Sequence, residues 1–98
     1  MKLLAIEKEI SKVNWNEENE VLISESYQVY KLFQEGIIRE IYFNENENAV
    51  ILLECNSKEE ALKVLATLPL VKAGLISFTL MELHPYTGFD RLIFRILE

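Results

Sequence analysis

The sequence predicts an α+β fold in which two β-α-β units share one four-stranded antiparallel sheet, with both helices on one face. Three observations support this prediction. Apolar residues alternate over short β-rich segments, they recur at helical spacing between those segments, and an Asn-rich stretch at 44–48 separates two of the segments. The order β-α-β-β-α-β is the ferredoxin-like arrangement, which we expect for residues 1–98 as a single domain.

The first part of the chain is expected to hold one strand and one helix. Residues 2–8 alternate as a strand does, and residues 9–18 are polar, which indicates a loop. A helix is predicted over 18–35, because an apolar stripe about 120° wide runs along it. The stripe consists of Val21, Leu22, Val29, Leu32 and Phe33. Gly36 follows, where a left-handed residue commonly ends a helix.

The remaining elements follow from turn and cap signals. They are a hairpin of 37–43 and 49–55, a second helix that opens at Ser57, and a strand over 74–83 ended by His84-Pro85. Asn residues in the hairpin connection tolerate the left-handed region. Ser57 and Glu60 match the capping box Ser-x-x-Glu, and Pro69 is expected to stop the second helix.

Composition argues against several classes of function. The net charge is −6 and the Lys and Arg residues form no cluster, so we expect no nucleic-acid partner and no anionic membrane surface. No apolar run is long enough to span a bilayer. Cys55 and His84 are the only residues of their types, so we expect no metal site and no internal disulfide. A chain without disulfides fits the cytoplasm.

The apolar surface of the predicted sheet exceeds what one helix layer can cover. The central strands carry apolar residues on both faces, for example Leu52 beside Leu53. An apolar face left in water costs roughly 25 cal/mol per Å². We therefore expect a homodimer, or a higher homo-oligomer, closed sheet to sheet. The tail, residues 86–98, is too apolar for a free end. We expect it to form a strand or a short helix that contacts a neighbouring subunit.

Glu25 is the most informative candidate for a site residue. On the helical wheel it lies between Leu32 and Val29, inside the apolar stripe. A carboxylate there must be paired, have a raised pKa or line a cavity, and a raised pKa suits proton transfer near neutral pH. The alternatives are a side chain that reaches solvent from the edge of the stripe and a structural ion pair with Arg39.

Further candidates lie on the predicted strands. Arg39 alternates with large apolar residues and could bind a carboxylate bidentately, or it could be an edge-strand charge that discourages aggregation. Histidine is the residue type suited to carrying protons at neutral pH, so His84 at a strand end is a candidate; the alternative is a solvent-exposed strand terminus beside a turn. Tyr42 is a weaker candidate for substrate binding, as are the carboxylates Glu7 and Glu82. Cys55 is expected to be a small buried hydrophobe.

The segment 36–85 resembles the muconolactone isomerase family of the dimeric α+β-barrel superfamily. The residues that carry the resemblance are Gly36 followed by Arg39, the run Ser57-Lys58-Glu59-Glu60-Ala61-Leu62 leading to Leu68-Pro69-Leu70, and His84-Pro85. The first helix also matches through Glu25, eleven residues before Gly36. The chain departs from the family in its shorter loop before the first helix, in Ile37 and Ile38, and in its longer tail.

The resemblance implies a ferredoxin-like protomer in a homodimeric barrel that moves a proton within a small unsaturated lactone bearing a carboxylate, without a cofactor. On this hypothesis Glu25 or His84 carries the proton and Arg39 anchors the acid, with Tyr42 as a weaker candidate for substrate binding. The alternative is a non-catalytic protein for ligand binding or assembly on the same scaffold. If the site is real, we expect Glu25 within a few ångströms of Arg39, with its pKa lowered by the pairing, and His84 nearer the mouth.

Overall fold

The computed structural model describes residues 1–10 and 12–97, with side chains up to residue 93. Its elements are β1 (Lys2–Glu9), α1 (Asn19–Gln34), β2 (Ile38–Phe43), β3 (Ala49–Glu54), α2 (Lys58–Leu65), α3 (Pro69–Lys72), β4 (Ile76–Leu83) and α4 (Asp90–Leu97). In the described part of the chain, no helix is both long and apolar enough to cross a bilayer.

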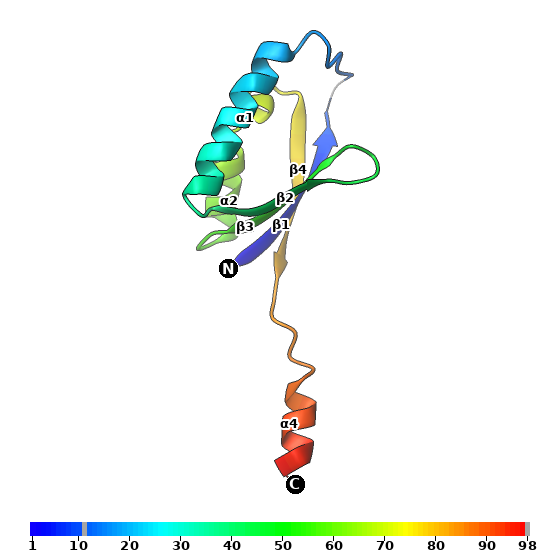
Figure 1. The fold of residues 1–98 in the computed structure, drawn as a ribbon, viewed down its shortest axis with the longest axis vertical. Coiled ribbons are helices and arrows are strands. Elements are labelled where there is room, and N and C mark those ends of the chain that lie inside the picture. Colours follow the sequence, from blue (N-terminus) through cyan, green and yellow to red (C-terminus); the bar gives the residue numbers. More distant parts are fainter. Residues whose placement is uncertain (11, 98) are drawn as a thin grey trace.

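The four strands form one sheet in the order β2-β3-β1-β4, and every neighbouring pair is antiparallel. Figure 1 shows α1 and α2 on the same side of this sheet. The predicted ferredoxin-like α+β fold is therefore confirmed. The core lies between the two layers and includes Leu3 of β1 and Ile51 and Leu53 of β3, each at most 1% exposed.

The strand register places another set of apolar residues on the opposite face. Leu4 pairs with Leu52 and Met81, and Ile6 pairs with Val50. These residues alternate with the core residues of the same strands, so they point away from α1 and α2. None of the helices in the described residues covers this face in Figure 1. The protomer thus has one packed sheet face and one open, largely apolar sheet face.

The helix boundaries follow the expected end signals, with one exception. The Ser57 side chain accepts a hydrogen bond from the Glu60 N–H at 3.1 Å, which confirms the predicted start of α2. Gly36 has φ +79° after α1, and the Ile37 N–H donates to the Leu32 carbonyl at 3.0 Å, as in a Schellman motif. The prediction for Pro69 is wrong. α2 ends at Leu65, and Pro69 is the first residue of the short helix α3. Proline is tolerated at this position because an N–H group in the first helical turn has no hydrogen-bond partner within the helix.

The β2–β3 hairpin differs from its prediction in one detail. The left-handed residue of the connection is Glu47, with φ +63°, rather than one of the asparagines. Asn44 instead accepts hydrogen bonds through Oδ1 from the N–H groups of Asn46 and Asn48, both at 3.0 Å. These bonds close the turn and leave Glu47 in the strained position.

The tail forms a helix, which is one of the two predicted conformations. α4 stands well away from the sheet and the other helices in Figure 1, and the chain measures 64 × 27 × 20 Å as a result. Phe89, Leu92 and Ile93 at its start are 65%, 59% and 54% exposed. These three side chains of the tail therefore lie outside the core of their own protomer.

Candidate functional site

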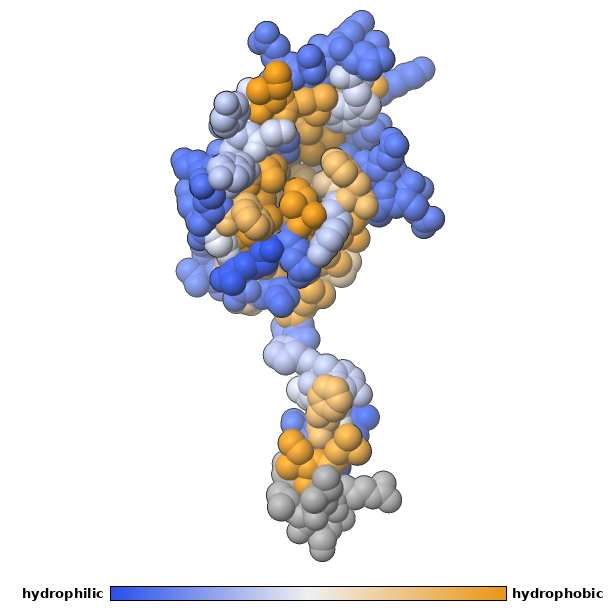
Figure 2. All heavy atoms as spheres, viewed as in Figure 1, coloured by the Kyte–Doolittle hydropathy of each residue, from blue (hydrophilic) through white to orange (hydrophobic). Residues whose placement is uncertain are grey.

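A cavity of about 960 Å³ opens between α1 and the helix-facing side of the sheet. Its lining is mainly apolar and includes the aromatic side chains of Trp15, Tyr30, Phe33, Phe43 and Phe78. Three carboxylates also line it, those of Glu7, Glu25 and Glu47. Figure 2 shows apolar side chains gathered in the hollow between α1 and the β2–β3 hairpin. A cavity of this size is typical of small-molecule sites.

The cavity exists because α1 does not pack its whole apolar stripe on the sheet. Leu32, near the end of α1, is only 5% exposed and belongs to the core, as predicted. Phe33 was also predicted to be core, but it lines the cavity and is 52% exposed. Ala49 on β3 lines the opposite side of this space. The apolar stripe of α1 is therefore divided between a packed part and a cavity wall.

Glu25 projects from α1 into the wall of this cavity. Its Oε1 accepts a hydrogen bond from the Leu70 N–H at 3.0 Å, so it also ties α1 to the start of α3. Burial raises the pKa of the Glu25 carboxyl above its ordinary value, the Leu70 bond opposes this shift, and the charge of Glu7 adds to it. Glu25 is thus a half-buried carboxyl held toward its neutral form.

Glu7 lies on the floor of the cavity, on the helix-facing side of β1. Only 8% of the residue is exposed, and its Oε1 accepts a hydrogen bond from the Ala49 N–H at 3.2 Å. Burial raises the pKa of Glu7, the Ala49 bond opposes the shift, and Glu9 adds to it. The backbone N–H groups of Ala49 and Leu70 each bond to Oε1 of these carboxyls, and both carboxyl groups line the cavity. In both carboxyls burial shifts the pKa upward, in the direction that suits proton transfer.

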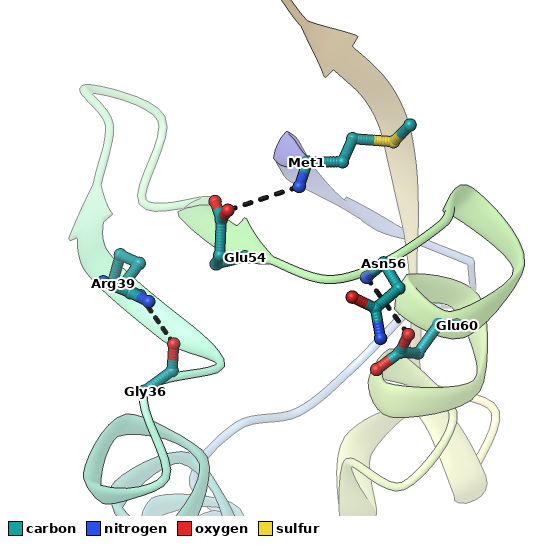
Figure 3. Close-up of polar contacts among 6 residues, drawn as sticks. All are labelled: Met1, Gly36, Arg39, Glu54, Asn56 and Glu60. Atoms are coloured by element: carbon teal, nitrogen blue, oxygen red, sulfur yellow. Dashed lines mark hydrogen bonds and ion pairs between the residues drawn. The ribbon is translucent and has the colours of Figure 1, made fainter.

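The structure does not bring Arg39 to Glu25. The Arg39 Nε donates to the Gly36 carbonyl oxygen at 2.6 Å, and its side chain is exposed (Figure 3). Among the described residues, no ion pair joins Glu25 to Arg39. The expected pairing is therefore wrong, and so is the lowered pKa that depended on it, because burial dominates and raises the pKa of Glu25. The β-bulge between Ile38 and Glu40 alters the alternation that suggested where Arg39 would point.

Tyr42 and His84 also lie apart from the cavity lining within the described residues. The Tyr42 hydroxyl donates to Glu40 Oε1 at 2.6 Å, which raises the pKa of Tyr42. His84 is exposed, and its Nε2 lies 3.5 Å from Glu82 Oε2. Glu7 pairs with Phe78, whereas the strand end beside His84 lies five residues further along β4, about 17 Å away at strand rise. Convergence of Glu25, Arg39 and His84 is thus not observed.

Sequence reasoning ranked Glu7 too low and missed the aromatic lining. One signal was available, because Glu7 shares a strand face with Leu3 and Ala5, both fully buried in the structure. Trp15 gave no such signal, since it lies in a polar loop, and its Nε1 donates to Glu9 Oε1 at 3.2 Å. Cys55 is 5% exposed, which confirms its predicted burial. No three His, Cys, Asp or Glu side chains in the described ranges are placed to hold a metal ion.

Fold and cavity together define a class of protein: a ferredoxin-like α+β domain with an apolar, carboxylate-bearing cavity of small-molecule size. The fold is similar to that of 5-chloro-2-hydroxyhydroquinone dehydrochlorinase (TftG) from Burkholderia phenoliruptrix AC1100, solved in complex with 2,5-dihydroxybenzoquinone. The TM-score is 0.66 at 12% identity, over 88% of this chain and 97% of that chain. At this identity the likeness shows the fold alone. No protein-family model and no curated protein matches the sequence.

Proposed function

We propose that the protein is a cofactor-independent isomerase that moves a proton within a small cyclic compound bound between α1 and the sheet. The observation that carries this proposal is a cavity of about 960 Å³ that holds two carboxyl groups, Glu7 and Glu25, with raised pKa values. Carboxyl groups of this kind serve as general bases and acids at neutral pH.

The reaction needs one group that takes a proton and returns it elsewhere. In its ionised form the Glu25 carboxylate removes a proton from the carbon next to a ring carbonyl, and the electrons shift to form a dienolate. The resulting carboxylic acid then protonates the carbon at the far end of the conjugated system, which moves the double bond by one position. Glu7 in its neutral form donates a hydrogen bond to the developing enolate oxygen. Atoms and charge balance without a further reactant.

The comparison with a solved structure supports the proposal indirectly. The protein of similar fold carries the name of a dehydrochlorinase and was solved with 2,5-dihydroxybenzoquinone, which is a small ring compound. A fold of this kind can therefore hold a ring, and the aromatic lining of the present cavity suits one. Arg39, Tyr42 and His84 take no part in the proposed step, because the cavity lies elsewhere. Their roles in substrate binding or catalysis stay predictions.

A non-catalytic binding protein is the second candidate, and one observation favours it. Glu7 and Glu25 each accept a backbone N–H, so both could be kept for structure alone. In that case a ring compound would bind and leave unchanged. The two candidates differ in whether protons of the bound compound exchange with solvent.

The proposal is tested with two uncharged substrates, a β,γ-unsaturated γ-lactone and cyclohex-3-enone, each incubated with the protein in D₂O and followed by proton NMR. We expect double-bond migration with deuterium incorporation above the buffer rate. Glu25→Gln should lower the rate at least about a hundredfold, because general acid–base catalysis contributes that much. Glu20→Gln, an exposed change on the same helix outside the cavity lining, is the matched control. A Glu25→Gln variant as active as the wild type, or no migration with either substrate, contradicts the proposal.

A further inference from the structure

The charges around the cavity decide which ring compounds it accepts. Its ionisable lining residues are acidic (Glu7, Glu25 and Glu47) apart from the phenol of Tyr30, and no Lys, Arg or His lines it within the described residues. Arg39, the cation that would anchor an acidic ligand, is held at the Gly36 carbonyl instead. A carboxylated ligand would therefore meet like charges and no compensating partner in a partly desolvated space.

Aromatic side chains line the cavity beside aliphatic ones. Trp15 comes from the loop before α1, Phe33 from α1, Phe43 from β2 and Phe78 from β4, so rings surround the cavity from both layers. Such rings favour stacked or edge-on contacts with a planar ligand. The carboxyl groups of Glu7 and Glu25 add two hydrogen-bonding groups to this apolar surface.

We infer that the cavity selects an uncharged planar ring compound carrying a hydroxyl or carbonyl group, and that it rejects the carboxylated analogue. This inference rests on the proposed function for the location of the site and narrows its substrate class. It departs from the acidic lactone that the family resemblance implies, because the residues that would neutralise an acid are not at the cavity. An uncharged ligand is also preferred over an organic cation, because the lining is mainly apolar and aromatic and a buried cation would lose its hydration there.

Three probes with the same ring system separate these possibilities at neutral pH: 2-naphthol, 2-naphthoate and 2-naphthylmethylammonium. Binding is measured by saturation-transfer NMR and isothermal titration calorimetry. We expect 2-naphthol to bind at least about tenfold more tightly than 2-naphthoate, because juxtaposed like charges oppose binding. Tighter binding of the cation, equal binding of the naphthoate, or no binding of 2-naphthol would overturn the inference.

Two variants link the selectivity to named residues. Glu7→Gln and Glu25→Gln keep an oxygen for the Ala49 and Leu70 N–H groups, so the fold should survive, and circular dichroism checks it. Combined, they should raise the affinity for 2-naphthoate severalfold, whereas Glu20→Gln should leave it unchanged. These binding measurements do not depend on turnover. Selective binding without isomerisation would refute the proposed function alone, and isomerisation with unselective binding would refute this inference alone.

Discussion

The Glu7 side chain lies in line with Leu3 and Ala5 on the helix-facing side of β1, where a charge is expensive. Its burial is tolerated because the Ala49 N–H donates to Oε1 and because Glu7 lines a cavity rather than a fully packed part of the core. Glu25 on α1 is likewise a partly buried carboxyl that lines the cavity, and it accepts a hydrogen bond from the Leu70 N–H. At the scale of single residues, each carboxyl therefore joins two elements of the fold and also lines the cavity.

The pH dependence of stability tests the state of Glu7. Its pKa is raised above the ordinary value of 4.5, so the folded chain binds this proton more tightly than the unfolded chain does. The free energy of unfolding should therefore fall as pH rises from 4.5 through the raised pKa, and the Glu7 contribution is fully present only below that window. Glu7→Gln should lose less stability over the same window. Urea denaturation at several pH values measures the difference.

Glu45→Gln provides the control for this prediction, because it removes the same charge from an exposed position in the hairpin. It should keep the pH dependence of the wild type. If Glu7→Gln and the wild type lose the same stability between acidic and neutral pH, the Glu7 carboxyl is not shifted.

At the scale of secondary-structure elements, the connection between α2 and β4 shows why a proline can be misinterpreted: Pro69 begins a helix rather than ending one. Proline can end a helix by disrupting the preceding turn, or it can begin one, because its ring presets φ. Here α2 has already ended at Leu65, and Pro69 begins α3, whose second residue donates its N–H to Glu25. α3 in turn contacts α1. Only the tertiary contact with α1 distinguishes the two uses of Pro69.

The Ser57 cap is the clearest local determinant of an element. Ser57→Ala removes the acceptor of the Glu60 N–H and should lower the free energy of unfolding by about 1 kcal/mol. Ser57→Asp keeps an acceptor at the same place and should retain most of the stability. Chemical denaturation of both variants tests this prediction, and equal losses in the two would show that the cap does not stabilise α2.

At the scale of the whole molecule, the open sheet face is the feature that predicts a partner. It presents Leu4, Ile6, Val50, Leu52 and Met81 on the side away from the helices. We expect a second copy to cover this face, because the same patch on two copies gives a self-complementary interface. Leu52→Lys should then yield a monomer of 11.5 kDa in sedimentation velocity. Leu62→Lys, at a 51% exposed position on α2, should leave the oligomer intact. A monomeric wild type would refute this expectation.

The protruding tail gives a second prediction at this scale. The exposed Phe89, Leu92 and Ile93 of the tail need cover that their own protomer does not supply. Deletion of residues 88–98 should therefore lower the oligomeric state or the melting temperature. The double variant Leu92→Gln with Ile93→Gln should have the same effect. It keeps the full chain length, so the effect would come from the loss of apolar contacts and not from the loss of the segment itself. An unchanged oligomer in both variants would show that the tail is not an oligomer contact.

Local signals were sufficient for the four strands, α1 and α2 and for their order, but they did not predict α3 and left the tail open between a strand and a helix. Alternation, helical spacing, Gly36 and the Ser57 cap each act within a few residues, so the strands, helices and ferredoxin-like topology could be predicted from the sequence. The site could be predicted only in part. Glu25 was found because a carboxylate inside an apolar stripe is conspicuous, whereas Arg39 was misplaced because a bulge altered the alternation of β2.

By itself, the sequence determined the fold class, the apolar surplus of the sheet and the presence of a carboxylate among core positions. The tertiary structure decided that α1 leaves a cavity on the sheet, that Glu7 joins Glu25 there, and that Arg39, Tyr42 and His84 lie elsewhere. The physical reason is the distance along the chain between the residues that interact. Secondary structure follows from interactions between near neighbours in the chain, but a cavity depends on how closely two layers approach, which residues far apart in the sequence determine jointly.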